Sequence, residues 1–342
     1  MTVESQWDTE AFDKIPTYDD IEQAAQRLRG WAVETPLLES PALNEAAGGR
    51  VFMKAESLQR TGSFKFRGAF NRISLIPAGA RRGGVVAYSS GNHAQGVAAA
   101  AQILGIPAVI VMPKDAPKVK IERTRSYGAE VVLYDRIRES REEIGDDLAR
   151  QRAATLVRPY DDPGIIAGQG TCAMEIAAQA RASNARLDSL LVCCGGGGLT
   201  AGSALAMEKL SPDTEILTVE PAGFDDTKRS LEAGQIRENR GNESSICDAL
   251  LAPQPGRLTF AINKDRVSGG LSVTDDEVRA ALDFAFHTLK LVLEPGGAVC
   301  LAAVLSGKLD CRHRTVALTL SGGNVDPELL CTVLGDGVLA AS

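Results

Sequence analysis

One lysine lies between two aromatic residues in the stretch Gln59-Arg-Thr-Gly-Ser-Phe-Lys-Phe-Arg-Gly-Ala69. Packing against Phe64 and Phe66 should partly desolvate the ammonium group of Lys65, and desolvation lowers the pKa of a lysine. A lysine that is neutral near pH 7 can attack a carbonyl carbon and form a Schiff base. Taken alone, the stretch favours a plainer alternative, a lysine whose stem covers two core phenylalanines while its head reaches water.

A run of glycines follows the predicted strand over residues 189–194 and precedes a predicted helix: Gly195, Gly196, Gly197 and Gly198. Without Cβ atoms, successive backbone N–H groups can close around a phosphate at the positive end of that helix. The residues from Gly196 to Ala201 also fit the G-x-G-x-x-A pattern of dinucleotide sites, and Glu220 ends the next strand at the spacing of a ribose-binding acid. The run predicts a phosphate site and leaves its ligand open.

Two further loops place polar groups where predicted strands end. The first, Ser89-Ser-Gly-Asn-His93, opens a helix, so hydroxyls, an amide and free N–H groups converge on a position suited to a carboxylate or a ring oxygen. The second, Thr319 to Asn324, points the hydroxyl of Ser321 toward the same edge of a sheet. Each loop taken alone also fits an ordinary strand-end turn.

An acidic loop follows the strand that ends at Glu220. The carboxylates of Glu220 and Asp226, with a backbone carbonyl and waters, could hold a hard cation such as Mg or Ca. A solvated acidic loop fits these residues at least as well.

Strands and helices alternate regularly along most of the chain. The first series predicts strands over 85–88, 108–112, 130–134 and 155–157, with helices beginning at His93, Lys118 and Ser140. The second predicts strands over 189–194, 215–219 and 315–320, with helices after Gly198 and from Asp275. Such alternation indicates an α/β fold with parallel sheets covered by helices. Two sheets with a cleft between them fit best, and ligands of such sheets bind beyond the carboxyl ends of the strands.

Composition limits the classes of partner. The 342 residues carry a net charge of -7, which argues against nucleic acid or an anionic membrane as the main partner. The N-terminal region has no apolar run of signal-peptide or membrane-span length, which predicts a cytoplasmic protein. The seven cysteines have neither zinc spacing nor the appearance of a disulfide framework.

Together these stretches resemble the fold-type II pyridoxal-phosphate enzymes, in particular the serine/threonine dehydratase and serine racemase group. The resemblance runs from about Ile15 to Val333 through motifs in the family's order: S-F-K-F-R-G-A around Lys65, S-S-G-N-H from Ser89, G-Q-G-T at 168–171, the four glycines, V-E-P at 219–221, L-E-P-G-G-A at 293–298 and L-S-G-G-N-V at 320–325. It implies a tryptophan-synthase-beta-like fold and a homodimer. Residues 1–83 and 160–342 would form the large cofactor-binding domain, and residues 84–159 the small domain with the substrate loop.

The resemblance also implies roles for the cofactor residues. Lys65 would hold pyridoxal 5'-phosphate as an imine and then act as the base at the substrate Cα, with Phe64 packed against the cofactor ring. Asn92 would hydrogen-bond the ring hydroxyl oxygen, and Ser321 would meet the pyridine nitrogen. The four glycines at 195–198 would bind the phosphate.

The substrate and cation residues follow from the same resemblance. The loop that holds the substrate carboxylate would consist of Ser89, Ser90, Asn92 and His93, and Ser90 matches the position of the second, hydroxyl base in racemases. The carbonyl of Phe224 would join Glu220 and Asp226 at the cation site.

These roles predict the reaction type. A serine at the pyridine nitrogen cannot hold that nitrogen protonated as a carboxylate would, so a long-lived carbanion is disfavoured and loss of a β-leaving group is favoured. The cofactor phosphate could serve as the general acid for a β-hydroxyl. We therefore expect elimination of water from a β-hydroxy amino acid, with L-threonine or L-serine as the default substrate of the group.

Three alternatives stay open from the sequence. A 3-hydroxyaspartate dehydratase or a serine racemase shares almost every motif, and a dinucleotide-binding module would use the glycines alone. Arg141 lies where relatives can place a basic residue near the cleft, although a surface arginine is the commoner case. Leu250 replaces a small residue expected in the dehydratase pattern, which counts against plain serine specificity.

Overall fold

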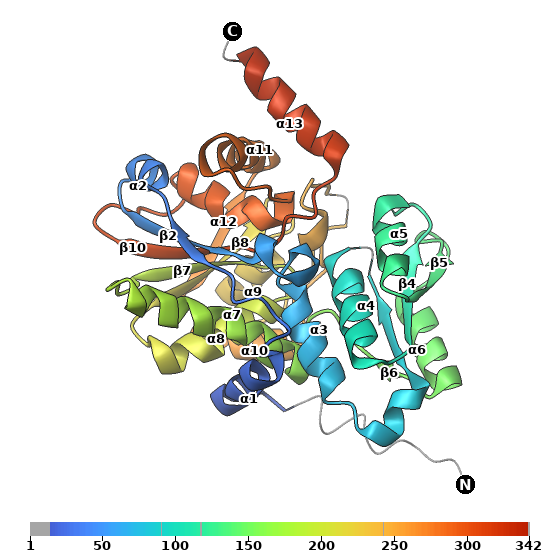
Figure 1. The fold of residues 1–342 in the computed structure, drawn as a ribbon. Helices are drawn as coiled ribbons and strands as arrows, with labels where there is room; N and C mark the ends of the chain where they lie inside the picture. Colours follow the sequence, from blue (N-terminus) through green and yellow to red (C-terminus); the bar gives the residue numbers. More distant parts are fainter. Residues whose placement is uncertain (1–13, 90, 117, 242, 341–342) are drawn as a thin grey trace.

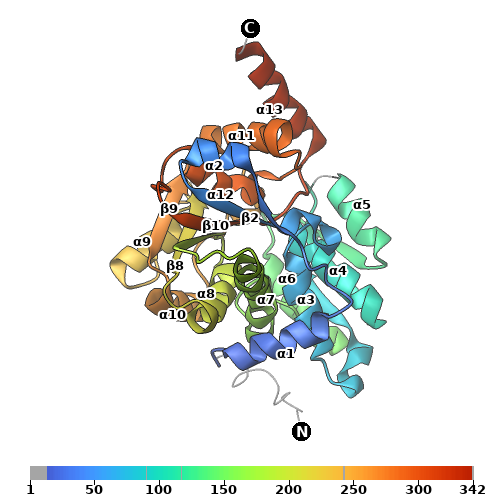
Figure 2. The ribbon, with the colours of Figure 1, turned by 60° about the vertical axis from the view of Figure 1, so that its left-hand side comes forward.

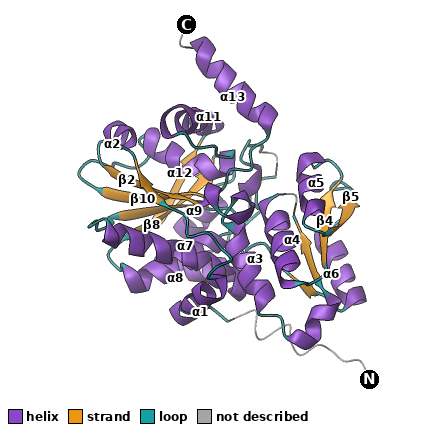
Figure 3. Ribbon diagram, viewed as in Figure 1, coloured by secondary structure: helices purple, strands orange, loops and turns teal. Residues whose placement is uncertain are grey.

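Two mostly parallel sheets organise the computed structural model, which describes residues 14–89, 91–116, 118–241 and 243–340. The larger sheet has the strand order β1-β2-β10-β7-β8-β9. Its labelled strands β2, β10 and β8 appear as orange arrows on the left of Figure 3. Its strands are β1 (Leu37–Glu39), β2 (Arg50–Ala55), β7 (Ser189–Cys193), β8 (Glu215–Pro221), β9 (Gly269–Val273) and β10 (Thr315–Leu320). Only the edge pair β1 and β2 is antiparallel among the described strands. The fold class predicted from the alternation is confirmed.

The smaller sheet lies beside the larger one, on the right of Figure 1. Its order is β5-β4-β3-β6, from β3 (Val85–Tyr88), β4 (Ala108–Pro113), β5 (Glu130–Tyr134) and β6 (Thr155–Leu156), all parallel. The connecting helices are α4 (Asn92–Leu104), α5 (Lys118–Ser126) and α6 (Arg141–Arg152). Every residue of β4 is buried, as expected for an inner parallel strand.

Helices cover both faces of the larger sheet, as Figures 1 and 2 show. One layer contains α1 (Tyr18–Leu28), α7 (Pro163–Ala182), α8 (Gly198–Leu210) and α10 (Arg257–Arg266). The other contains α2 (Pro41–Ala47), α11 (Asp275–Phe284) and α12 (Pro295–Leu305), with α13 (Pro327–Ala340) beyond it. The helix α9 (Asp226–Ala233) packs against β9. None of the described helices is long and apolar enough to cross a bilayer.

The helix α3 (Lys65–Ser74) lies between the two sheets and packs on both α4 and α7. A buried charged cluster fixes its first turn. Arg67 donates to both carboxylate oxygens of Glu56 at 2.8 and 2.7 Å and to both of Glu175 at 2.6 and 2.8 Å. Lys54 on β2 donates to Glu175 at 2.6 Å. Buried charges need such partners, so the cluster ties the first turn of α3 to α7 and to the residue that follows β2.

Elements without a clear periodicity were not predicted. The predicted strands of the smaller sheet, and those over 189–194, 215–219 and 315–320, lie within a residue or two of the observed ones. The long helix α7 and the apolar helix α12 had no such prediction, because they are buried on most sides and show no clear periodicity. The strand β9 had none because it begins with two glycines and only Val273 is buried.

Candidate active site

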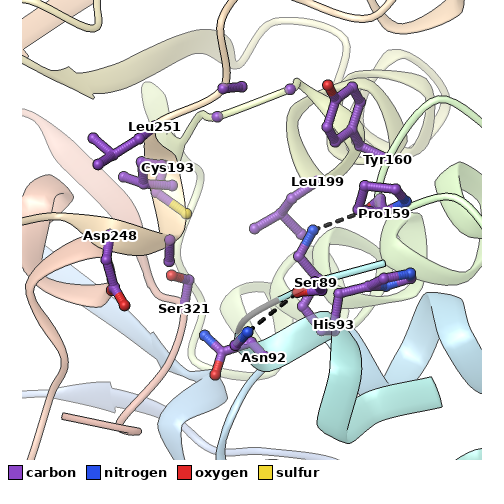
Figure 4. A pocket seen from close by; sticks show the side chains of 18 of the residues that line it. Ser89, Asn92, His93, Pro159, Tyr160, Cys193, Leu199, Asp248, Leu251 and Ser321 are labelled. Atoms are coloured by element: carbon purple, nitrogen blue, oxygen red, sulfur yellow. Dashed lines mark hydrogen bonds between the residues drawn. The ribbon is translucent and has the colours of Figure 1, made fainter. Parts of the chain in front are cut away.

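One pocket between the two sheets brings together most residues that the sequence singled out (Figure 4). They come from α3, the loop before α4, the turn before α8 and the end of β10. The predicted residues that line it are Phe64, Lys65, Ser89, Asn92, His93, Gly195, Gly196, Gly197, Gly198 and Ser321. Ser90 lies outside the described residues.

Lys65 is enclosed at the start of α3. Its Nζ donates to the carbonyl oxygen of Pro159 at 2.8 Å and lies 5.2 Å from the ring centroid of Phe64. Burial lowers the pKa of Lys65 to about 8, although the thiol of Cys193 and the carboxyl of Glu294 act in the opposite direction. Phe66 packs instead against Phe70 in the core, with 5.6 Å between ring centroids. The amine of Lys65 is therefore desolvated by the pocket as a whole, and not by two flanking aromatic rings as the sequence suggested.

The four glycines form the turn into α8. Gly197 has φ 93°, a left-handed conformation that favours glycine, and it begins α8 without a side-chain cap. A Cβ on Gly196 would lie 2.4 Å from the ring of Tyr160, so a larger residue does not fit there. The first backbone N–H groups of α8 thus face the pocket without a capping side chain, as an anion site requires.

Asn92 is held by two side chains from the larger sheet's side. Its Nδ2 donates to Glu294 Oε1 at 2.5 Å, and its Oδ1 accepts from Asn324 Nδ2 at 2.7 Å. Burial and the charge of Asp248 raise the pKa of Glu294 to about 7, while the hydrogen bond from Asn92 lowers it. Glu294 had no predicted role of its own, although a glutamate directly before Pro-Gly-Gly at a helix start is a readable signal.

His93 and Ser89 complete the loop before α4. The imidazole Nε2 donates to the carbonyl oxygen of Val157 at 2.9 Å, and Nδ1 has no partner among the described residues. Burial, with Lys65 nearby, lowers the pKa of His93 to about 3, so the ring is neutral at ordinary pH. Ser89 Oγ accepts from the N–H of Gly91 at 3.2 Å, which shapes the turn.

Ser321 and Cys193 lie on one side of the pocket in Figure 4, across from Tyr160. Ser321 Oγ donates to the carbonyl oxygen of Gly296 at 3.4 Å. Burial raises the pKa of the Cys193 thiol to about 11, and hydrogen bonds with Ser321 and Thr319 act against that shift. Sequence reasoning missed Cys193, because a cysteine at the end of an apolar strand looks like core.

Three charged side chains also line the pocket: Lys120, Arg141 and Asp248. The guanidinium of Arg141 lies 5.6 Å from the ring centroid of Tyr88 and pairs with exposed Glu142 at 2.7 Å. Leu250 lines the same pocket, as the departure from the dehydratase pattern suggested. Arg141 therefore lies at the pocket, which was the less favoured of its two alternatives from the sequence, although its side chain is 41% exposed.

The residues of the predicted cation site do not line this pocket. The carboxylate of Glu220 accepts the backbone N–H groups of Thr227 and Lys228, both at 2.8 Å, at the start of α9. Asp226 accepts from Asn239 at 2.6 Å, and burial raises its pKa to about 6. Among the described residues, no group of three or more histidine, cysteine or acidic side chains could hold a metal. The contacts of Glu220 also remove the basis for a ribose-binding acid.

The pocket fits the cofactor that the resemblance implies. A buried amine with a pKa of about 8 suits an imine link to an aldehyde, and the uncapped glycine turn suits a phosphate. The oriented amide of Asn92 suits a ring oxygen. All three line one pocket, so a single molecule with these groups could contact them together.

Comparisons with known proteins agree with this geometry. A family model described as "Pyridoxal-phosphate dependent enzyme" matches residues 29–322. The L-threo-3-hydroxyaspartate ammonia-lyase of Pseudomonas sp is 45% identical, over 94% of this chain and 99% of that protein. The serine racemase of Schizosaccharomyces pombe is 40% identical, over 92% and 96%. The crystal structure of a threonine deaminase from T.th. has a TM-score of 0.85 and 44% identity, over 91% and 99%. The chain therefore belongs to the pyridoxal-phosphate-dependent enzymes.

Proposed function

We propose that the protein eliminates water from a β-hydroxy amino acid and releases a 2-oxo acid and ammonia. The observation that carries the proposal is the shared pocket of Lys65, the glycine turn, Asn92 and Ser321. Pyridoxal phosphate, when bound, supplies the electron sink for the bond electrons left at the substrate Cα. The residues around the substrate then determine which of its bonds at Cα and Cβ break.

Lys65 is the proposed base for the Cα proton. With a pKa of about 8, its amine is partly neutral near pH 7 and can accept a proton at Nζ. His93 is neutral and donates to a backbone oxygen, so it positions the loop rather than carrying a proton. The first turn of α4, with Ser89 and Asn92, would bind the substrate carboxylate through N–H groups.

The substrate we favour carries a second carboxylate, as 3-hydroxyaspartate does. Arg141 lines the pocket and stays charged at any ordinary pH, and its guanidinium fork matches a carboxylate. The 45% identical relative acts on L-threo-3-hydroxyaspartate. Leu250 also lines the pocket, at a position where the serine/threonine pattern has a smaller residue.

L-Serine and L-threonine form the second candidate class. The 44% identical structure is a threonine deaminase, and the 40% identical relative is a serine racemase. An oxo-acid assay across L-serine, L-threonine and the hydroxyaspartate stereoisomers separates these candidates. Chiral analysis of recovered substrate reports racemisation. A holoenzyme that releases no oxo acid from any of these amino acids contradicts the proposal.

Arg141→Met tests the second carboxylate directly. The variant should raise KM for 3-hydroxyaspartate roughly 10- to 100-fold, because it removes a charged hydrogen-bond donor. KM for L-serine should change little. Arg150→Met is the matched control, since Arg150 lies on the same helix with an exposed side chain. Equal changes for both substrates would remove Arg141 from the substrate site.

Three further features are proposed from the sequence and its resemblance. A divalent cation, Mg or Ca, would bind Glu220, Asp226 and the carbonyl of Phe224, and EDTA should then lower stability or activity. The protein would be a cytoplasmic homodimer, which sedimentation and fractionation can test. Residues 84–159 would form the small domain with the substrate loop, and residues 1–83 and 160–342 the large cofactor-binding domain.

A further inference from the structure

An ion pair crosses the pocket between parts of the chain that pack on different sheets. Lys120 lies on α5, which packs on the smaller sheet, and Asp248 lies on the short helix η4 (Asp248–Leu250), which packs on α12. Their Nζ and Oδ2 atoms are 2.6 Å apart, and both residues line the pocket. Asp248 lies on the same side as Ser321 and Cys193 in Figure 4. Neither residue has a part in the proposed elimination step.

The two side chains differ in exposure, which indicates how the pair is used. The side chain of Lys120 is 14% exposed and that of Asp248 is 54% exposed. An ion pair with one solvated partner adds little to the stability of a fold. Both charges do act on the pocket. Asp248 raises the pKa of buried Glu294, and Lys120 lowers it.

Charge in the pocket matters for a substrate with two carboxylates. Asp248 without a partner would repel such a substrate, and Lys120 neutralises it. The ammonium of Lys120 has three donors, and Asp248 is the acceptor that the described residues provide. Lys120 can therefore donate to a second carboxylate while it keeps its bond to Asp248.

We propose that Lys120 and Asp248 form a charge selector for the substrate's second carboxylate. Lys120 attracts that carboxylate, and Asp248 holds the ammonium at the pocket and limits the attraction. The inference rests on the proposed function and adds a residue pair that sets substrate class. The competing role is purely structural. The same ion pair links α5 to η4, so it could act only as a strut, a contact that holds the two parts of the chain together.

Two substitutions separate the selector from a strut. Lys120→Gln and Asp248→Asn break the same ion pair but leave opposite charges in the pocket. The probes are succinate and butanoate, four-carbon acids with two carboxylates and one, titrated calorimetrically into the holoenzyme. Lys120→Gln should weaken succinate binding about tenfold, and Asp248→Asn should leave it unchanged or strengthen it. Butanoate binding should change less than about twofold in both variants.

Controls address folding and general charge. Lys118→Gln removes an equal charge from an exposed position of the same helix and should leave succinate binding unchanged. Lys120→Arg keeps the charge and should restore most of the affinity that Lys120→Gln loses. Thermal melting confirms that each variant is folded.

The outcomes are distinguishable from those of the oxo-acid assay. If both Lys120→Gln and Asp248→Asn weaken succinate and butanoate alike, or if neither changes succinate, the selector is overturned. Binding is measured without turnover, so a failure of the proposed elimination would not by itself produce either result. Conversely, turnover by the wild-type enzyme with no selectivity in the variants would leave the elimination standing and remove the selector.

Discussion

Lys65 should impose a pH dependence on the stability of the cofactor-free protein. Its pKa falls from 10.5 to about 8 on burial, so the folded state binds fewer protons than the unfolded state between these values. Stability should therefore rise with pH from about 8 to 10.5, and the burial costs about 3 kcal/mol at pH 7. Lys65→Met should be more stable than the wild-type apoprotein at pH 7. Urea unfolding across this range tests the difference, and parallel curves for the two proteins would contradict it.

Glu294 should act in the opposite sense. Burial raises its pKa from 4.5 to about 7, so the folded state binds more protons than the unfolded state between these values. Below these values the carboxyl is protonated and carries no charge that burial would penalise. The free energy of unfolding should therefore fall as the pH rises from about 4.5 to 7. Glu294→Gln should abolish that fall, since an amide oxygen still accepts from Asn92. Unfolding free energies at pH 5 and pH 8 provide the measurement, and a fall of equal size in the variant would refute the assignment.

The sequence predicted which of its chemically active residues share one site, but it did not predict the other side chains that line that site. Lys65, Asn92 and Ser321 carry chemistry at strand or helix ends, and the carboxyl ends of parallel strands share one edge. Cys193 and Glu294 reach the same pocket from apolar surroundings, where their types match core residues or helix starts. Such residues become visible only when the distances across the fold are known.

At the scale of helices and strands, the close contact between α3 and α7 depends on two glycines. A Cβ on Gly168 would lie 2.6 Å from the Cα of Gly68, so the two helices approach at backbone distance. Gly168→Ala should push α3 away, at a cost of about 2 kcal/mol. Cofactor affinity should also fall, because Lys65 begins the displaced helix.

Thermal melting and cofactor titration of Gly168→Ala measure both effects. Gly79→Ala is the control, because a Cβ there meets no atom within 4 Å and the residue has no positive φ. Loss of stability with unchanged cofactor affinity would show that α3 can shift without moving Lys65. The G-Q-G-T motif marked this position in the sequence, but only the packing explains why a glycine stands there.

The charged cluster around Arg67 shows what pattern alone cannot predict about an element. Arg67 is part of the S-F-K-F-R-G-A motif and had no predicted partner, yet its guanidinium is buried between Glu56 and Glu175, which are far apart in the sequence. Alternation of strands and helices predicts layers, because it reflects local burial. It does not reveal a long-range ion cluster, or the antiparallel edge strand β1, whose direction depends on the connection through α2.

At the scale of the whole molecule, two sets of polar bonds between described residues join α4 and α5 to the side of the larger sheet. Asn92 bonds to Glu294 and Asn324 inside the pocket. Lys120 pairs with Asp248, and Arg123 Nη1 donates to Asn324 Oδ1 at 3.0 Å, in more exposed positions. Such partly exposed bonds contribute about 0–1 kcal/mol each. A ligand present at roughly a thousand times its Kd contributes about 4 kcal/mol. A cofactor that contacts Asn92 on one side and the glycine turn on the other should therefore add more to the coupling between the sheets than these exposed bonds do.

Removal of pyridoxal phosphate should therefore loosen the smaller sheet more than the larger one. Amide hydrogen exchange of β3, β4 and α4 should accelerate in the apoprotein, whereas α12 and β10, which are buried in the larger core, should keep their protection. Adding the cofactor back should restore slow exchange in the wild type and only partly in Lys65→Ala, which lacks the amine for the covalent link. Equal acceleration in both sheets would mean that the cofactor stabilises the fold as one cooperative unit and that the pocket is not where the molecule divides.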